Sequence, residues 1–248
     1  MKAIPKFKVD GILFDLGSTL LEYETIPWSI LDIKALEAGY AFLKEEGYSV
    51  PEPEKFGEKY LEIRTRIRDA SAITLREWKM SELDEEFLRS LNINGGPELA
   101  ARFFDSYYQP ISRQLTLFAD AHHVLRKIRS MGKKIGLVSN TFFPEEYHIR
   151  ELDRFELTRY FDFTLYSVTF GYRKPHPAIF RRAIDLMKLL PEQLLFIGDR
   201  FREDYLGAKE NGMNAILKYR EGREYPDPFP EDVIVVHSLA ESLDYIGE

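Results

Sequence analysis

Short apolar runs that end in polar residues alternate with helical patterns over most of this sequence. Residues 12–14, 135–138 and 194–197 have the length and composition of buried parallel strands. Further strands are expected near 163–166 and 215–218, and a last strand and helix from Val233. Between the strands, helices are predicted after Asp120 and from Pro144, Pro177 and Glu203. This alternation predicts an α/β fold with a Rossmann-like parallel sheet and right-handed crossovers.

Residues 21–113 interrupt the alternation and show helical patterning without a convincing strand. Their apolar positions recur at three- and four-residue spacing, as in Ile33, Leu36, Tyr40 and Leu43. Other helices are predicted over 54–70, 75–91 and 97–108, with glycine and proline between them. We therefore expect an α/β core formed by residues 1–20 and 114–248, with an all-helical domain inserted at 21–113.

Polar residues stand where the apolar runs end, which is where open α/β sheets bind ligands. Asp15, Ser139 and Asp199 each follow such a run. Lys174 lies in a proline-rich loop before a predicted helix, and Asp204 lies five positions after Asp199. Two strand-end acids, a hydroxyl, a lysine and a further acid are expected to form one site.

In this order and spacing, the motifs resemble those of the haloacid dehalogenase (HAD) superfamily, whose members are mostly Mg-dependent phosphatases. Asp15 matches the nucleophile of that family, Ser139 the hydroxyl of its second motif, and Lys174 the lysine of its third. Asp199 and Asp204 match its fourth motif. The resemblance implies a HAD fold in which the helical insert is a C1-type cap domain.

The resemblance also implies a mechanism for a small phosphorylated substrate. Asp15 would attack the phosphorus and form an aspartyl phosphate that water hydrolyses. Mg²⁺ would be bound by Asp15, Asp199, Asp204 and the backbone carbonyl of Gly17. A set of three residues would bind the phosphate: Ser139, Asn140 and Lys174.

The first motif departs from the family pattern at Gly17. The phosphatases carry a second Asp there, usually followed by glycine, whereas this chain has Gly17 followed by Ser18. The general acid/base is therefore missing, and weak activity is expected. A turn that needs glycine is expected to have moved with it to position 17. His122 or His123 could replace the acid, although both are expected on a helix surface, behind Asp120 as N-cap.

Composition limits the other functions and partners. The net charge of −7 argues against nucleic acid and anionic membranes as partners. The absence of cysteine excludes disulfides and thiol catalysis. There is no apolar signal segment among the first residues and no 18-residue apolar run, so a cytoplasmic protein is expected. Residues 225–230 are rich in proline and are expected to form a surface loop. The oligomeric state is left open.

Three functions fit these observations. The first is a HAD-type phosphatase of low activity, and the second is a non-catalytic protein that binds metal and phosphate. The third is a phosphonatase-like enzyme that cleaves a C–P bond, since that branch also has a small residue at the position of Gly17. It would need a Schiff-base lysine from the insert, with five candidates: Lys34, Lys44, Lys55, Lys59 and Lys79. Dehalogenation is less favoured, because Asp199 and Asp204 together indicate a metal.

Overall fold

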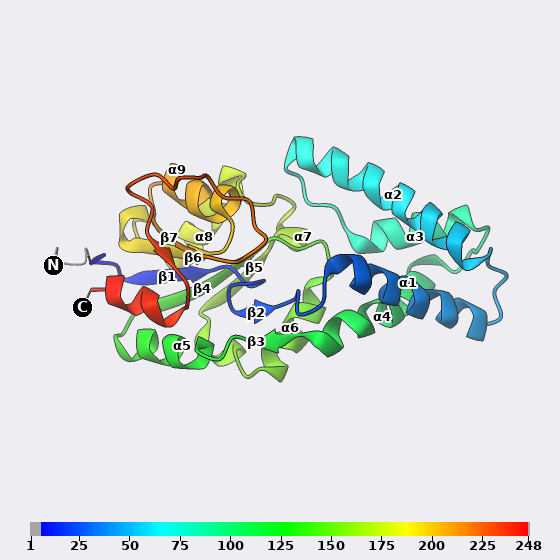
Figure 1. Cartoon of the computed structure of the whole chain (residues 1–248), viewed down its shortest axis with the longest axis horizontal. Helices are drawn as coiled ribbons and strands as arrows, with labels where there is room; N and C mark the ends of the chain where they lie inside the picture. Colours follow the sequence, from blue (N-terminus) through cyan, green and yellow to red (C-terminus); the bar gives the residue numbers. More distant parts are fainter. Residues whose placement is uncertain (1–5, 248) are drawn as a thin grey trace. The chain divides into compact units, whose positions relative to one another are not determined.

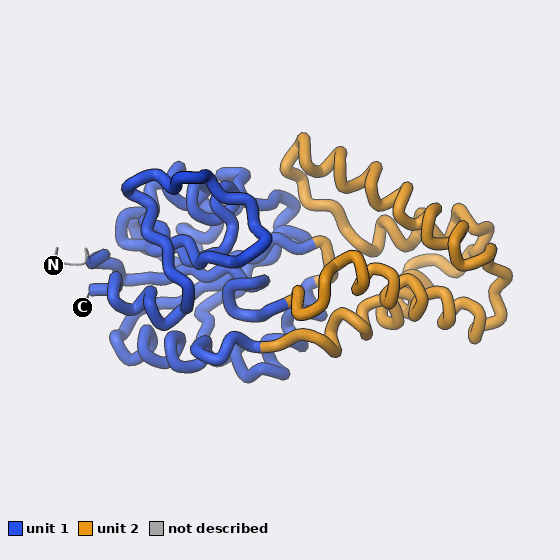
Figure 2. The backbone as a smooth tube through the Cα atoms, viewed as in Figure 1, with its two compact units in different colours: residues 1–22, 117–141, 145–248 blue, residues 23–116, 142–144 orange. Residues whose placement is uncertain are grey.

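A computed structural model describes residues 6–247, and the first five residues of the expected signal-free N-terminus lie outside it. The chain forms two compact units (Figure 2). The α/β unit comprises residues 1–22, 117–141 and 145–248, and the helical unit comprises residues 23–116 and 142–144. The helical unit thus gains a short segment, Phe142–Pro144, from a distant part of the sequence. Among the described residues, no helix has the length and apolar sequence needed to span a bilayer.

The α/β unit is built on a six-stranded sheet in the order β5-β4-β1-β6-β7-β8. All adjacent strands in it are parallel. This confirms the predicted α/β class with a parallel sheet. The strands are β1 (Gly11–Phe14), β4 (Lys134–Ser139), β5 (Phe163–Tyr166), β6 (Leu194–Gly198), β7 (Asn214–Lys218) and β8 (Val235–Val236).

Helices cover both faces of this sheet (Figure 1). Alternate side chains of a strand point to opposite faces, so Leu13 packs on one side while Ile12 and Phe14 face the other. The helices and turns of the unit, in chain order, are α5 (Ala121–Ser130), α6 (Glu145–Arg154), η1 (Thr158–Tyr160), α7 (Ser167–Phe170), α8 (Pro177–Met187), η2 (Pro191–Gln193), η3 (Phe201–Leu206), α9 (Gly207–Glu210) and η4 (Ala240–Tyr245).

Four long helices make up most of the helical unit: α1 (Trp28–Glu45), α2 (Pro53–Thr74), α3 (Met80–Ser90) and α4 (Gly96–Gln114). Aromatic rings fill its interior, with the ring centres of Phe56 and Phe87 4.8 Å apart and those of Tyr60 and Phe87 4.9 Å apart. One carboxyl group lies among these rings. Asp84 is fully buried and accepts a 3.0 Å hydrogen bond from the Tyr60 hydroxyl.

Some local expectations were wrong. The predicted helix over 75–91 begins only at Met80, because Leu75 adopts a left-handed conformation that ends α2. A short strand, β2 (Leu21–Glu22), lies where none was expected and pairs with β3 (Thr116–Leu117). The Asp120 side chain does not cap α5; it accepts a hydrogen bond from the Ala240 N–H instead.

Candidate active site

The carboxyl edge of the sheet brings the predicted site residues together. Asp15 follows β1, Ser139 ends β4 and Asp199 follows β6, and β1 lies between β4 and β6. The chain reverses the order of its strands at β1, which is the position where open parallel sheets form ligand sites. Asp15 donates its backbone N–H to the Ile197 carbonyl at 3.0 Å, and this bond holds its side chain beside the end of β6.

The Lys174 ammonium group joins two of the acids. Its Nζ lies 2.8 Å from Asp15 Oδ1 and 2.6 Å from Asp204 Oδ1, and it also donates to the Val138 carbonyl at 2.8 Å. Only 1% of Lys174 is exposed. A buried ammonium group with three acceptors has all three of its hydrogens engaged, so its position is tightly fixed.

Asp204 comes to the site on η3, a π-helical turn that follows β6. Its second oxygen, Oδ2, accepts the backbone N–H of Arg200 at 2.9 Å. Gly198 makes room for this carboxyl group, because a Cβ atom there would lie 2.4 Å from Asp204 Cγ. The absence of a side chain at Gly198 thus permits the approach of Asp204 to Asp15.

The three carboxylates are suited to bind a cation. One oxygen from each of Asp15, Asp199 and Asp204 lies within 4.8 Å of the others. Burial raises the pKa of Asp204 to about 7, against the opposing effect of Lys174. Burial and the Asp15 carboxylate also raise the pKa of Asp199. Burial is the largest cause of both shifts, and the neighbouring carboxylates raise both pKa values further. Because Mg²⁺ prefers carboxylate oxygens, the donor set fits such an ion.

The second motif supports Lys174. The Asn140 side chain accepts the backbone N–H of Lys174 at 2.7 Å and donates to its carbonyl at 2.9 Å. Asn140, which was expected to bind substrate, therefore fixes the backbone that carries the lysine. Ser139 is 4% exposed and its backbone is in register with Tyr166 of β5.

The expectation that the turn after β1 needs glycine at position 17 was wrong. Ser18, not Gly17, has the positive φ, at +56°. The left-handed position therefore did not move with the glycine, and a side chain at position 18 costs about 1–2 kcal/mol. Thr19, on the same turn, donates to Asp15 Oδ2 at 3.3 Å.

Two basic residues of this site were missed by the sequence analysis. Arg223 places Nε 2.7 Å from Asp199 Oδ2 and Nη2 3.0 Å from Ser18 Oγ. Lys218, at the end of β7, donates to the Ser18 carbonyl at 2.8 Å. In addition, the Tyr225 hydroxyl donates to the Asp199 carbonyl at 2.8 Å. Tyr225 belongs to the segment 225–230, which was expected to form a surface loop, and it contacts the site instead. The position of Lys218 at the end of a predicted strand was the one sequence signal that could have placed this lysine at the site.

The histidines have other surroundings. His122 Nδ1 lies 3.3 Å from the Tyr160 hydroxyl, and His123 is exposed on the same helix. Among the described residues, no hydrogen bond joins either histidine to the three acids. These contacts favour the interpretation that both are helix-surface residues.

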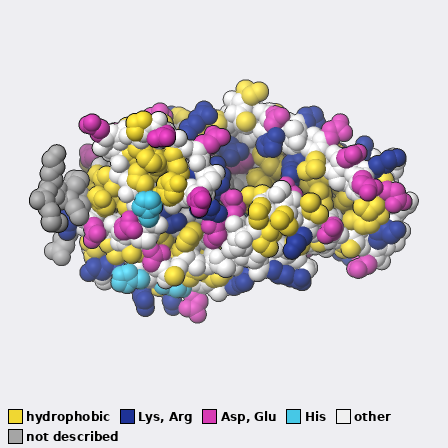
Figure 3. Space-filling model, viewed as in Figure 1, with side chains coloured by type: hydrophobic (Ala, Val, Ile, Leu, Met, Phe, Trp, Pro, Cys, Tyr) yellow, Lys and Arg dark blue, Asp and Glu magenta, His cyan; other side chains and the backbone are white. Residues whose placement is uncertain are grey.

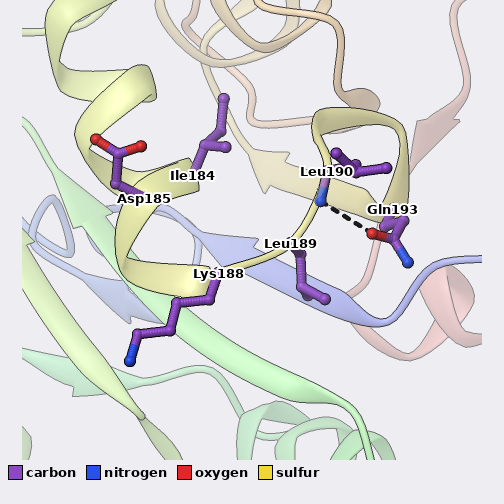
Figure 4. A pocket seen from close by; sticks show the side chains of 6 residues that line it. All are labelled: Ile184, Asp185, Lys188, Leu189, Leu190 and Gln193. Carbon is purple, nitrogen blue, oxygen red and sulfur yellow. Dashed lines mark hydrogen bonds between the residues drawn. The ribbon is translucent and has the colours of Figure 1, made fainter.

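A separate pocket of about 400 Å³ lies at the opposite edge of the sheet, between the end of α8 and η2 (Figure 4). Its lining includes Lys188, Leu190 and Gln193, and the Gln193 side chain accepts the Leu190 N–H at 2.9 Å. It contains none of the site residues described above.

The fold and the acid–lysine cluster define an α/β protein with a carboxylate-lined site at the strand-order reversal of its sheet. Residues 9–212 match the model of the haloacid dehalogenase-like hydrolases, and the chain belongs to this family.

Similar proteins span most of the chain. A glyceraldehyde 3-phosphate phosphatase of Methanopyrus kandleri is 25% identical over 224 residues, covering 90% of this chain and 89% of that protein. A phosphoserine phosphatase of Thermus thermophilus is 26% identical over 234 residues, covering 89% and 93%. A solved 2-haloacid dehalogenase from Pseudomonas syringae pv. Tomato has a TM-score of 0.72 at 23% identity, covering 96% and 97%. This last similarity concerns the fold.

Proposed function

We propose that the protein is a magnesium-dependent phosphatase that hydrolyses a small phosphorylated metabolite. The observation that carries this proposal is the buried Lys174 ammonium group, which bridges Asp15 and Asp204 beside Asp199. The names of the glyceraldehyde 3-phosphate and phosphoserine phosphatases among its relatives support the same activity. We further propose that the helical unit is the C1-type cap of this family.

Each site residue then has a role. Asp15 attacks the phosphorus and forms an aspartyl phosphate. Lys174 holds Asp15 in place and balances charge on the phosphate, to which Ser139 donates a hydrogen bond. Asp15, Asp199 and Asp204, with the Gly17 carbonyl, would hold Mg²⁺. When bound, Mg²⁺ neutralises the negative charge of the phosphate.

Activity is proposed to be weak for substrates with basic leaving groups. Gly17 has no side chain that could protonate a departing alkoxide, and general acid catalysis typically contributes ~10²–10⁴-fold. The same observation favours a second candidate, a protein that binds metal and phosphate without turnover.

A phosphatase screen tests the proposal. Wild type would be assayed with Mg²⁺ on many phosphorylated metabolites and an aryl phosphate, then with a chelator. Phosphate release should require Mg²⁺, disappear in Asp15→Asn and persist in Asp185→Asn, a control on the exposed side of α8. Binding of Mg²⁺ and phosphate without any release would support the second candidate.

The location in the cytoplasm and the absence of a nucleic-acid partner stay predictions. Acidic and basic side chains are interspersed on the face shown in Figure 3.

A further inference from the structure

Two buried or half-buried cations contact the turn that lacks the acid. Lys218 Nζ lies 2.8 Å from the Ser18 carbonyl oxygen, and Arg223 Nη2 lies 3.0 Å from the Ser18 hydroxyl. Ser18 directly follows Gly17. Lys218 is 3% exposed and its ammonium group lies 3.7 Å from the centre of the Phe118 ring. Two cations thus contact the turn on which the family resemblance places a carboxylate, and the Glu22 carboxylate, paired with Arg220, accepts a hydrogen bond from Ser18 Oγ at 3.4 Å.

Arg223 also connects this turn to the proposed metal site. Its Nε lies 2.7 Å from Asp199 Oδ2, and the Arg223 side chain is 16% exposed. One guanidinium group thus bridges a strand-end carboxylate and the residue after Gly17. The guanidinium group is planar and always charged, so these two hydrogen bonds fix the orientation of the Arg223 group and keep its positive charge beside Asp199.

The charges of the site balance without an acid at position 17. With all three acids ionised, the carboxylates of Asp15, Asp199 and Asp204 balance the three cations Lys174, Lys218 and Arg223, and the Glu22–Arg220 pair adds one charge of each sign. A divalent cation would leave a net charge of about +2. A phosphate dianion would then neutralise the site. A leaving group that departs as an anion would be stabilised by the positive charges of Lys218 and Arg223.

We propose that Lys218 and Arg223 are specificity-determining residues that adapt this site to acyl phosphates, the mixed anhydrides of phosphoric and carboxylic acids. The inference rests on the proposed phosphatase function. The Arg223 guanidinium stays charged and does not act as an acid, and Lys218 Nζ donates to the Ser18 carbonyl and lies against the Phe118 ring. The positive charges of Lys218 and Arg223 can therefore stabilise a departing carboxylate, which needs no proton, whereas an alkoxide leaving group needs the acid that Gly17 does not supply.

The reaction balances without an enzymic acid. An Asp15 oxygen forms a bond to phosphorus while the bond between phosphorus and the acyl oxygen breaks. The electron pair of that bond stays on the acyl oxygen, which leaves as a carboxylate anion. Water then attacks the phosphorus of the aspartyl phosphate, the bond to Asp15 breaks, and the proton from water goes to the phosphate product or to solvent.

The test compares acetyl phosphate with a simple alkyl phosphate in the presence of Mg²⁺. Wild type should favour acetyl phosphate in kcat/KM by ~10² or more, the lower end of the contribution of a missing acid. Arg223→Gln and Lys218→Met should each lower kcat/KM for acetyl phosphate by about tenfold or more, mainly through kcat. Arg223→Lys keeps the charge and should recover part of this loss.

Arg220→Gln is the matched control, because Arg220 lies on the same loop but pairs with Glu22 at 2.9 Å. It should retain wild-type kinetics. A second measurement, calorimetry with inorganic phosphate and Mg²⁺, should show weaker phosphate binding in Arg223→Gln and Lys218→Met than in Arg220→Gln. Thermal unfolding of each variant identifies any that does not fold, in which case Arg223→Lys carries the comparison.

The outcomes separate the inference from the function on which it rests. Equal kcat/KM for acetyl and alkyl phosphates, or equal effects of Arg223→Gln and Arg220→Gln, would overturn the inference and leave the phosphatase proposal intact. Turnover of neither substrate class by wild type, in a screen that includes other phosphates, would overturn both.

Discussion

Asp199 is a proposed ligand of the metal; it is 1% exposed, and its Oδ2 atom accepts a hydrogen bond from Arg223. Asp199→Asn removes a carboxylate charge from the cluster. We expect its Mg²⁺ affinity, measured by calorimetry, to fall about tenfold or more, because even indirect ligand partners contribute ~10–100-fold. Asp185→Asn should bind as wild type does. Equal affinity in all three proteins would remove Asp199 from the metal site.

The turn at Gly17 and Ser18 gives a second prediction at this scale. The double change Gly17→Asp with Ser18→Gly restores the order of the family and places glycine at the left-handed position, φ +56°. It should hydrolyse alkyl phosphates at least about tenfold faster than wild type, a low threshold beside the ~10²–10⁴ of general acid catalysis. Ser18→Gly alone relieves the backbone but supplies no acid, so it should show no such gain. A double variant no faster than this control would mean that more than the acid is lacking.

Individual residues were predictable only where a local pattern marks them. Asp15 and Asp199 follow apolar strands, so their meeting at one sheet edge could be expected. Arg223 could not be found in this way. It lies 24 positions after Asp199 in a loop without periodicity, and only the folded path of that loop returns it to the carboxylate.

At the scale of elements, the close approach of η3 to β6 depends on Gly198. In Gly198→Ala the new Cβ would lie 2.4 Å from Asp204 Cγ, so Asp204 must move away from Lys174. We expect Mg²⁺ affinity and phosphatase activity each to fall about tenfold or more. Gly57→Ala is the control: its Cβ would meet only Leu36 Cδ1 at 4.0 Å, and it should stabilise α2 by about 0.5–1 kcal/mol. An unchanged Mg²⁺ affinity in Gly198→Ala would show that Asp204 is dispensable.

The helical unit has a titrating group in its interior. Burial raises the pKa of Asp84 well above its ordinary value, and the Tyr60 hydrogen bond only partly offsets this. The folded state therefore prefers the protonated acid. The stabilising contribution of the protonated Asp84 carboxyl group is fully present below the ordinary pKa of Asp. It is lost as the pH rises through the higher pKa that Asp84 has in the folded state. Between these two pKa values, the free energy of unfolding falls by about 1.4 kcal/mol for each step of one in pH.

Asp84→Asn should remove this pH dependence. Chemical denaturation from about pH 4 to 8, a range that begins near the ordinary pKa of Asp, should show wild type losing stability relative to Asp84→Asn as pH rises. Asp69→Asn, at an exposed position of α2, should follow wild type. Parallel pH profiles of wild type and Asp84→Asn would mean that Asp84 does not titrate differently in the folded state.

Element types were easier to predict than their ends. The buried strands and the long helices have clear apolar periods. The start of α3 at Met80 and the short strands β2 and β3 have no such period, because contacts with segments distant in the sequence determine them. The Met80 N–H donates to the Phe142 carbonyl, and β2, before the helical insert, pairs with β3, which follows it in the sequence.

At the scale of the whole molecule, the central claim is that the protein turns over phosphates through Asp15 although Gly17 provides no acid. Loss of the acid also slows attack of water on the aspartyl phosphate, so the phosphoenzyme should accumulate. The most direct measurement is mass spectrometry of acid-quenched protein after incubation with Mg²⁺ and an aryl or acyl phosphate. We predict one added phosphoryl group on the peptide that contains Asp15, and none in Asp15→Asn. A protein that binds Mg²⁺ and phosphate but shows neither this adduct nor phosphate release would contradict the claim and identify a binding protein.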